Sequence, residues 1–480
     1  MDIAQHWIDG AWRNNGDVAE TISVYTGGVN ATYASAGAAV AEDAIAVARR
    51  TFERSSWAHQ PRLRAAALLE LADAIEVRRD EIARQIAIEN GKVLPHCIHE
   101  TNAAISEARY YAGLARAIFG RVTDIDAGKQ SIFAHEPIGV AAIVVPWNAP
   151  STLLLRSLGP ALAAGCTVVL KGAHQTSSVN RLYAECLAAC PSLPAGVVNV
   201  IHGDLEMSQT LCQHVEVDVV SFTGSSATGK AIMAAGAPTL KRLSLELGGK
   251  APSLVFDDAD MDAAVREIAG GVIPHTGQMC TAIARILVQD SAWDAFVPKL
   301  AAALGQVTVG DPLDASVRMG PLFNEDSVTR YERDIASARQ VGETILDGTL
   351  VRGHPRANVV TPALYAVQDR DHRLVQEELF APIGILERFS TEEEAVISAN
   401  ATRYGLAASV HSQNHSRARR VSRALKSGTV WINCHNRLFA EAETGGYRES
   451  GLGRLHGLEG LADFMETKHI YAEYGHLPTG

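Results

Sequence analysis

The stretch Ile138-Gly-Val-Ala-Ala-Ile-Val-Val145 decides the fold class of this chain. It is continuously apolar and stops at Pro146, which is typical of a strand buried on both faces of a parallel sheet. Segments with helical periodicity separate it from four similar stretches. The expected strands are 140–145, 167–171, 197–201, 217–222 and 242–247, and the expected helices are 151–164, 177–189, 205–212 and 227–236. This alternation predicts a doubly wound, Rossmann-like α/β domain that binds a nucleotide.

A second α/β unit is expected after Gly249, and a helical region precedes the first unit. The expected strands of the second unit are 253–256, 285–288, 408–411 and 429–432, and its expected helices are 260–270, 293–303, 325–341, 392–399 and 416–426. Helical periodicity also covers 41–91 and 99–118, whereas 1–40 mix strand and turn. Residues 120–136 lack a core pattern, so we expect them to pair outside the domain.

The composition of the chain limits its functional classes. With 480 residues, 47% of them hydrophobic and 20% charged, it is expected to be globular, with roughly two to four domains. Its net charge of -11 argues against nucleic acid or an acidic membrane as partner, because phosphates attract clustered cations. The first ten residues lack the pattern of a signal peptide, and no apolar run is long enough for a membrane span. The 7 cysteines are scattered, so we expect a cytoplasmic protein without a bound metal.

Cys280 and Glu246 are the candidate chemical groups. Cys280 follows the Gly277-Gln278 turn, where the lack of a glycine side chain allows a ligand close to the backbone. A single cysteine is more often inert core, and that alternative stays open for Cys280 taken alone. Glu246 lies in Leu245-Glu-Leu-Gly-Gly-Lys250, an apolar strand that ends in two glycines. A thiol that forms an acyl intermediate and a carboxylate that activates water make a chemical pair.

Three loops are expected at the carboxyl edge of the first sheet, where open α/β sheets bind their ligands. They are Pro146-Trp-Asn-Ala-Pro150, Lys171-Gly-Ala-His174 and Thr223-Gly-Ser-Ser-Ala-Thr-Gly229. The third resembles a phosphate-binding turn at the start of a helix. It follows the fourth strand, whereas the usual dinucleotide fingerprint follows the first, so an unusual mode of cofactor binding is expected.

Together with Glu246 and Cys280, these loops resemble the aldehyde dehydrogenase superfamily. The resemblance extends from near Ala41 to Lys468. The matching segments, in family order and at family spacing, are Pro146-Trp147-Asn148, Phe222-Thr-Gly-Ser225, Leu245–Lys250, Gly277-Gln-Met-Cys280, Glu378-Leu-Phe-Ala-Pro382 and Ser450-Gly-Leu-Gly453. Six matches in register make chance similarity implausible.

This resemblance implies oxidation of an aldehyde to the carboxylic acid with NAD or NADP. Cys280 would attack as a thiolate, and the Asn148 amide and the Cys280 backbone N–H would hold the oxyanion. Glu246 would then activate water to hydrolyse the thioester. Lys171 and Glu378 would hold ribose hydroxyls. The implied cofactor site is Val145, Pro146, Trp147, Lys171, His174, Gly203, Phe222, Thr223, Gly224, Ser225, Thr228, Leu247, Glu378 and Phe380.

The resemblance also implies an architecture. It consists of a cofactor-binding domain (1–119 and 138–248), a catalytic domain (249–449) and a small β oligomerisation element (120–137 and 465–480). A homodimer or homotetramer follows by analogy. Two other classes compete with this interpretation. A CoA-acylating relative typically lacks the glutamate that Glu246 matches, and a non-catalytic homologue would have little need of Cys280, Glu246 and Asn148 together.

By register with the family, the substrate channel includes Ala149, Leu153, Arg156, Met279, Thr281 and Arg437, within a loop that runs to Thr444. Ala149 stands where many relatives have an aromatic residue, which favours an aromatic or otherwise bulky aldehyde. Arg156 matches an arginine that binds the substrate carboxylate in succinic semialdehyde dehydrogenases, although the second arginine of that pair falls at Pro274. A semialdehyde is therefore the alternative substrate, and a pairing of Arg156 with Glu441 or Glu443 is the structural alternative.

The cofactor loop departs from the family pattern. Relatives usually have Lys-Pro-(Ser/Ala)-Glu where this chain has Lys171-Gly-Ala-His174. A glutamate there repels the 2′-phosphate of NADP, whereas His174 is neutral or, when protonated, attractive. We therefore expect comparable use of NADP, increasing as the pH falls. Gly172 is expected to loosen the turn, and a solvated His174 without a role is the alternative.

Overall fold

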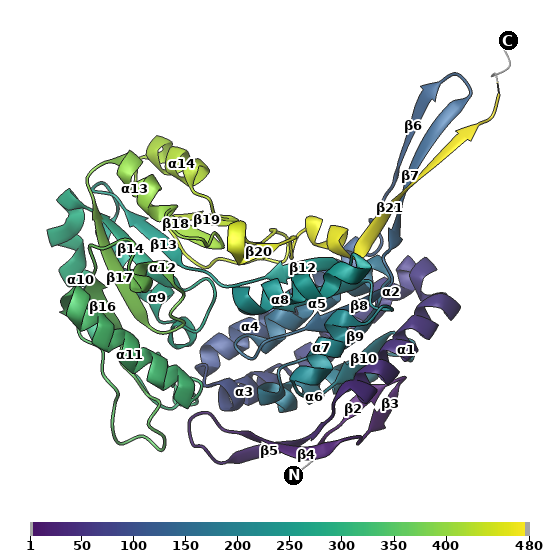
Figure 1. Ribbon diagram of the computed structural model, residues 1–480, viewed down its shortest axis with the longest axis horizontal. Helices are drawn as coiled ribbons and strands as arrows, with labels where there is room; N and C mark the ends of the chain where they lie inside the picture. The colour runs from purple at the N-terminus through teal and green to yellow at the C-terminus, as the bar shows by residue number, and fades with distance from the viewer. Residues whose placement is uncertain (1–2, 476–480) are drawn as a thin grey trace.

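The computed structural model describes residues 3–475, which form two α/β lobes and a projecting arm (Figure 1). The apolar stretch before Pro146 forms β8 (Val140–Val144), near the middle of an eight-stranded sheet. The strand order is β20 (Gly451–Leu452), β12 (Arg242–Glu246), β11 (Val219–Thr223), β8, β9 (Thr167–Lys171), β10 (Val198–Ile201), β2 (His6–Ile8) and β3 (Ala11–Arg13). From β12 to β10 the strands are parallel, and the outer ones are antiparallel.

Helices cover both faces of this sheet because alternate strand residues point to opposite sides. Val140 and Ala142 belong to one core, which includes α1 (Ala38–Arg54) and α7 (Leu205–Gln213). Ala141 and Ile143 belong to the other core. The helices of that second core are α2 (Pro61–Val77), α3 (Arg79–Asn90), α4 (Leu94–Leu114), α5 (Pro150–Ala164) and α6 (Ser177–Ala188), while α8 (Ser226–Gly236) lies with α1 and α7.

The second lobe contains a seven-stranded sheet. Its order is β15 (Glu343–Leu346), β16 (Ala363–Ala366), β17 (Ile383–Phe389), β14 (Ile283–Gln289), β13 (Ala251–Val255), β18 (Ala407–His411) and β19 (Thr429–Ile432). Except for the β15–β16 pair, all its pairings are parallel. The helices that pack against it are α9 (Met261–Val272), α10 (Trp293–Gly305), α11 (Glu325–Val341), α13 (Glu392–Ala399) and α14 (His415–Ala424); α12 (Arg373–Gln376) is a single turn.

The arm is a separate antiparallel sheet of β6 (Arg121–Asp126), β7 (Lys129–Pro137) and β21 (Met465–Glu473), which extends away from both lobes (Figure 1). Residues 120–136 thus pair outside the first sheet, as the lack of a core pattern predicts. A further small sheet of β1 (Ile3–Ala4), β5 (Val29–Ser35) and β4 (Asp17–Ile22) lies at the N-terminal edge. The oligomerisation role of the arm stays a prediction, and residues 476–480 of the predicted element lie outside the described residues.

The α/β fold class is confirmed, and the predicted domain boundaries stay predictions. No described strand of the eight-stranded sheet lies within 249–449, and all seven strands of the second sheet do. The predicted strand 217–222 is shifted, because β11 spans Val219–Thr223. Strands β15, β16 and β17 are absent from the strands predicted from the sequence. The omission of β17 has a physical reason: Glu387 and Arg388 interrupt its apolar pattern, although Glu387 is buried.

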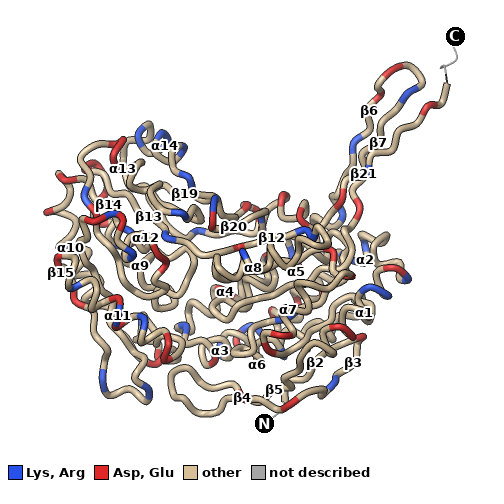
Figure 2. The backbone as a smooth tube through the Cα atoms, viewed as in Figure 1, with Lys and Arg blue, Asp and Glu red and all other residues tan. Residues whose placement is uncertain are grey.

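Charge is distributed without a strong bias over the molecule. Lys and Arg lie among Asp and Glu on both lobes and on the arm (Figure 2). Among the described helices, none combines the length and apolar character needed to cross a membrane.

The buried ion pair between Arg285 of β14 and Glu387 of β17 provides a test of the second lobe. Two hydrogen bonds of 2.6 and 2.7 Å join them, and the Arg285 and Glu387 side chains are only 0% and 3% exposed. Glu387→Gln leaves the guanidinium buried without a counter-charge, so we expect unfolding to become easier by about 3–5 kcal/mol. Urea unfolding followed by fluorescence measures this change.

A matched control is the exposed pair between Arg403 and Glu377, whose hydrogen bonds are 2.8 and 2.6 Å long. Because solvent screens that pair, Glu377→Gln should cost less than about 1 kcal/mol. Equal losses of stability in the two variants would show that burial does not make the loss of the counter-charge of Arg285 more costly.

Candidate active site

A cavity of about 400 Å³ contains all the residues assigned to catalysis and substrate binding. It is bordered by residues of α4, α5 and α9, by the end of β12, and by loops of the second lobe. The predicted residues that line it are Asn148, Ala149, Leu153, Arg156, Glu246, Met279, Cys280, Thr281 and Arg437. Cys280 and Glu246 lie 34 positions apart in the sequence, on two lobes, and the fold brings them to one hollow.

A strained loop presents Cys280. His275, Thr276 and Gly277 have φ values of 47°, 58° and 72°, a left-handed run that non-glycine residues seldom adopt. Gly277 is required by close approach as well, since a Cβ there would lie 2.3 Å from the backbone of Ala381. Gln278 holds the loop, because its side chain donates to His275 O at 3.0 Å and accepts from Phe323 N at 3.0 Å. The thiol position is thus fixed by hydrogen bonds on both sides.

Cys280 lines the cavity and is partly exposed. Burial raises its pKa to about 11, and the nearby carboxylates of Glu378 and Glu246 also raise it, while Arg156 lowers it. The thiol is therefore protonated at neutral pH in this state. Because the thiolate is the nucleophile, its proton must leave before or during attack.

Asn148 is fixed next to the thiol by its neighbours. Its side-chain Nδ2 donates to the carbonyl of Gln278 at 3.0 Å, which ties the loop after β8 to the cysteine loop. Asn90 supports the same loop by donating to the carbonyl oxygens of Trp147 and Asn148 at 3.2 and 3.4 Å. A primary amide has two N–H donors, so Asn148 retains one for a ligand in the cavity.

Glu246, at the end of β12, is a buried carboxylate with an unsatisfied oxygen. Its Oε1 has no hydrogen-bond partner among the described residues, and the residue is 3% exposed. Its Oε2 lies 3.6 Å from Nη1 of Arg156. Burial raises the pKa of Glu246, and Arg156 opposes that shift. Such a group accepts a proton more readily than an ordinary carboxylate.

The structural alternative for Arg156, a pairing with Glu441 or Glu443, is wrong. Arg156 contacts neither Glu441 nor Glu443: it donates to Thr223 Oγ1 at 3.0 Å and pairs with Glu246. Glu443 instead accepts from the backbone amide of Leu458 at 2.9 Å. Sequence periodicity shows which helix face carries Arg156. Its partners Glu246 and Thr223 lie at the ends of β12 and β11, so helix periodicity alone could not identify them.

All predicted cofactor residues except Glu378 and Phe380 lie at or after the carboxyl ends of β8, β9, β10, β11 and β12. From β8 the chain continues to β9 and β10 on one side of the sheet, and then crosses to β11 and β12 on the other side. The carboxyl edge between β8 and β11 is therefore the switch point at which open sheets bind nucleotides. Ser225 caps α8 by accepting from Thr228 N at 3.2 Å, which places a helix N-terminus there. The residues placed along these strand ends and loops are Val145, Pro146, Trp147, Lys171, His174, Gly203, Phe222, Thr223, Gly224, Ser225, Thr228 and Leu247.

The donor set at this edge fits the hydroxyl groups of a dinucleotide. Lys171 is 5% exposed and has no ion-pair partner among residues 3–475; burial lowers its pKa to about 8. Glu378 accepts from Gly249 N at 3.1 Å, and desolvation raises its pKa to about 7. Phe380, at a φ of 54°, follows it and packs edge-on against Trp147. Because Lys171 and Glu378 do not pair with each other, both side chains are available to hydrogen-bond the hydroxyl groups of a ribose.

The structure corrects the expectation for Gly172 in the second cofactor loop, whereas the alternatives for His174, an exposed residue, stay open. Gly172 does not loosen the turn, because Asn180 fills its place: a Cβ at Gly172 would lie 2.1 Å from Asn180 Oδ1, and Asn180 donates to Ala173 O at 2.9 Å. His174 stacks on Tyr33, and desolvation together with Lys171 lowers its pKa below the ordinary 6.5. His174 is therefore neutral at physiological pH, so it attracts a phosphate only in acid.

Several groups that line the cavity were missed by the sequence analysis. They include Lys92 and Glu100, which form a buried ion pair, and His456, which contacts the buried carboxylate of Glu107 outside the cavity lining. Arg437 pairs with Glu267 at 2.8 Å, and Trp431 contributes an aromatic wall. The polar residues interrupting the apolar face of 99–118 were a signal for Glu100 and Glu107, but nothing in the sequence identified their partners.

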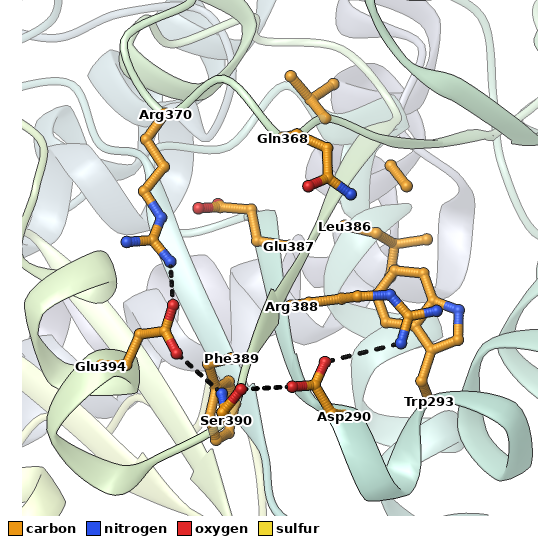
Figure 3. A pocket seen from close by; sticks show the side chains of 12 residues that line it. Asp290, Trp293, Gln368, Arg370, Leu386, Glu387, Arg388, Phe389, Ser390 and Glu394 are labelled. Atoms are coloured by element: carbon orange, nitrogen blue, oxygen red, sulfur yellow. Dashed lines mark hydrogen bonds and ion pairs between the residues drawn. The ribbon is translucent and has the colours of Figure 1, made fainter.

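A second hollow, of about 190 Å³, lies beyond the carboxyl ends of β14 and β17, at the end of the sheet opposite Cys280 (Figure 3). Its charged groups bind one another: Arg370 donates to Glu394 at 2.7 Å, and Arg388 lies 3.7 Å from Asp290. Because these charges are mutually satisfied, this hollow is a weaker candidate than the cavity at Cys280.

Known proteins resemble this chain over almost its whole length. The model of the "Aldehyde dehydrogenase family" matches residues 12–470. Aldehyde dehydrogenase 1 of Tanacetum cinerariifolium is 38% identical over 95% of this chain and 92% of its own. A point mutant of a betaine aldehyde dehydrogenase from Staphylococcus aureus, solved with NAD+, has a TM-score of 0.95 at 34% identity, covering 99% of this chain and 97% of that one. An NADP-dependent enzyme of E. coli has a TM-score of 0.94 at 34% identity, covering 98% of each chain.

These similarities agree with the site, where a cysteine, a carboxylate and an amide line one cavity beside the carboxyl edge of a parallel sheet. The chain belongs to the aldehyde dehydrogenase family and is an enzyme that oxidises aldehydes.

Proposed function

We propose that the protein oxidises a bulky or aromatic aldehyde to its carboxylic acid, with NAD or NADP as the hydride acceptor and a thioester on Cys280. The observation that carries the proposal is the common cavity of Cys280, Asn148 and Glu246 next to the carboxyl edge of the parallel sheet. Lys171 and Glu378 would hold the ribose hydroxyls of the dinucleotide, whose nicotinamide supplies the hydride-accepting carbon when bound.

Cys280 begins the reaction by losing its proton to solvent water and bonding to the aldehyde carbon, whose C=O π electrons move to the oxygen. The oxyanion that develops accepts hydrogen bonds from the free Asn148 N–H and from the Cys280 backbone amide, which has no other partner among the described residues. After hydride loss, a thioester remains on the sulfur. Glu246 takes a proton from water, the hydroxyl bonds to the acyl carbon, and the C–S bond breaks to release the acid.

The shape and chemistry of the cavity support a bulky, neutral aldehyde. A hollow of about 400 Å³ accommodates a ring, and Ala149 in its wall leaves that space open. Trp431 is the only Trp, Tyr or Phe lining it in residues 3–475, so an aromatic cage for a quaternary ammonium group is absent there. An anionic substituent on Arg156 would lie beside Glu246, where like charges repel. The semialdehyde alternative is therefore less favoured.

We further propose that the arm joins two copies of this chain in a homodimer or homotetramer within the cytoplasm. Every side chain of β6 is exposed, including Val122 and Ile125. An exposed edge strand with apolar residues favours pairing with another chain.

The first test of the mechanism is Glu246→Gln. Acylation does not need this carboxylate, so mixing with aldehyde and NAD+ should give a burst of NADH of about one equivalent, followed by turnover slowed on the order of 100-fold. Rapid-mixing absorbance of the reduced nicotinamide measures the burst. Intact mass spectrometry should reveal an acyl group on the protein. Cys280→Ala is the control and should give neither burst nor adduct. Steady turnover equal to that of the wild type would remove Glu246 from the mechanism.

The second test fills the cavity with Ala149→Phe. The ring occupies the space that we assign to a bulky substrate, so kcat/KM for benzaldehyde should fall at least about tenfold, while that for acetaldehyde changes less. Ala149→Ser is the matched small control. A wild type that clearly prefers short unbranched aldehydes, or an Ala149→Phe variant that keeps its benzaldehyde activity, would contradict the assignment.

The third test concerns the choice between cofactors. We expect comparable kcat/KM for NAD and NADP at pH 7 in the wild type, with a relative gain for NADP only as the pH falls below 6.5, because the pKa of His174 is lowered from that value. His174→Glu introduces repulsion of the 2′-phosphate and should reduce NADP use at least about tenfold. Strong NAD selectivity in the wild type that this variant leaves unchanged would show that another position decides.

A further inference from the structure

His456 is a buried residue in the wall of the active-site cavity; it contacts Glu107, and neither residue has a role in the steps above. His456 Nδ1 donates to Glu107 Oε1, and the side chains are 2% exposed each. The two residues are 349 positions apart, on α4 and on the loop after β20. His456 Nε2 and Glu107 Oε2 have no partner among the described residues. An imidazole nitrogen that is free, buried and located at a cavity is an unused proton acceptor.

The backbone around His456 is fixed in an unusual conformation. His456 has a φ of 60°, which a side chain with a Cβ seldom adopts unless its surroundings enforce it. Gly457 supplies that support: its amide donates to Ala440 O at 2.7 Å, and its carbonyl accepts from the Tyr111 hydroxyl at 3.1 Å. Leu455 and Thr444 exchange two backbone hydrogen bonds of 2.8 and 2.9 Å just before it. The loop thus holds the imidazole at the cavity.

Glu246 needs such a neighbour because it gains one proton in each turnover. It is buried, so it cannot release that proton directly to bulk solvent. Arg156, 3.6 Å away, stays charged and accepts no proton. His456 lines the same cavity and is a base. The charged or titratable groups around Glu246 and His456 are Glu107, Tyr110 and Tyr111 of α4, Arg156 of α5, and Glu443, Arg454 and Asp463 of the C-terminal loops.

We propose that His456, oriented by Glu107, receives the proton of the Glu246 carboxylic acid through water in the cavity and passes it to solvent. The proposal rests on the hydrolytic role of Glu246 given above. Neutral His456 takes the proton at Nε2, Glu246 returns to the carboxylate, and the imidazolium is stabilised by the Glu107 carboxylate until Nε2 releases the proton. No electron moves in this step. His456 acts through Glu246 and touches neither the aldehyde nor the thioester.

The test measures the burst and the steady state in the same experiment, with benzaldehyde and NAD+ as probes. In His456→Gln the burst amplitude and rate should be retained, because acylation does not use this pair. Turnover per burst-active site should fall at least about tenfold, since only deacylation is impaired. Added imidazole should restore turnover in proportion to its free-base concentration, and the acid side of the kcat profile should change shape. Glu107→Gln should show a smaller loss with the same response to imidazole.

Controls separate this role from a purely structural one. His411 of β18 is also buried, at 2% exposure, but it does not line the cavity, so a loss of stability in His411→Gln should bring no rescue by imidazole. Counting only burst-active sites removes misfolded protein from the comparison. Should neither single variant fold, the double variant His456→Leu with Glu107→Leu removes both polar partners together, and the same slow, imidazole-responsive turnover is expected of it.

Two results would overturn the proposal: turnover and pH profile per active site equal to those of the wild type, or a loss that imidazole does not relieve. Either result can occur while the function itself stands. Failure of the proposed function has a different signature, because the wild type and Glu246→Gln would then show no burst and no acyl adduct on Cys280.

Discussion

The carboxyl ends of β8 and β11 meet at one edge of the parallel sheet, and the geometry of the site depends on this constraint. The loop after β8 carries Asn148, and Thr223 at the end of β11 receives the hydrogen bond of Arg156. The adjacent β12 ends at Glu246. Because parallel strands bring their carboxyl ends together, the segment after β8 supplies Asn148 and Arg156, the end of β11 supplies the acceptor Thr223, and the end of β12 supplies Glu246, all at one place.

The cavity combines low solvent access with paired charges, and this combination explains its chemistry. Burial raises the pKa of both Cys280 and Glu246, which makes the thiol a poor nucleophile at rest and the carboxylate a better base. Arg156 opposes this effect of burial, because its positive charge lowers the pKa of both groups. Without it, Glu246 would hold its proton more firmly and Cys280 would ionise less readily. A cation that cannot lose its proton can adjust both groups without taking part in proton transfer.

The sequence predicted those parts of the protein that depend on local pattern. Apolar runs gave β9 and β19 with their observed ends, and motif spacing indicated Cys280, Asn148 and Glu246. It did not predict β17, whose buried Glu387 breaks the apolar run and is compensated by Arg285 across the sheet. The partners of Arg156 and His456 were inaccessible for the same reason. Side-chain pairing between distant segments depends on the packed structure, and a single sequence contains no local pattern for it.

Backbone strain concentrates where the chemistry is proposed. The described non-glycine residues with positive φ in the loops that border the cavity, and in the neighbouring loop of Glu378, are His275, Thr276, Phe380, Asn433, Asn436 and His456. Each such conformation is unfavourable alone and persists only where surrounding contacts enforce it. Gln278 supplies those contacts for the cysteine loop, and Tyr111 with Ala440 supplies them for the loop of His456. The same kind of support at two loops of one cavity favours the proposal that the placement of His456, like that of Cys280, serves the reaction rather than the packing alone.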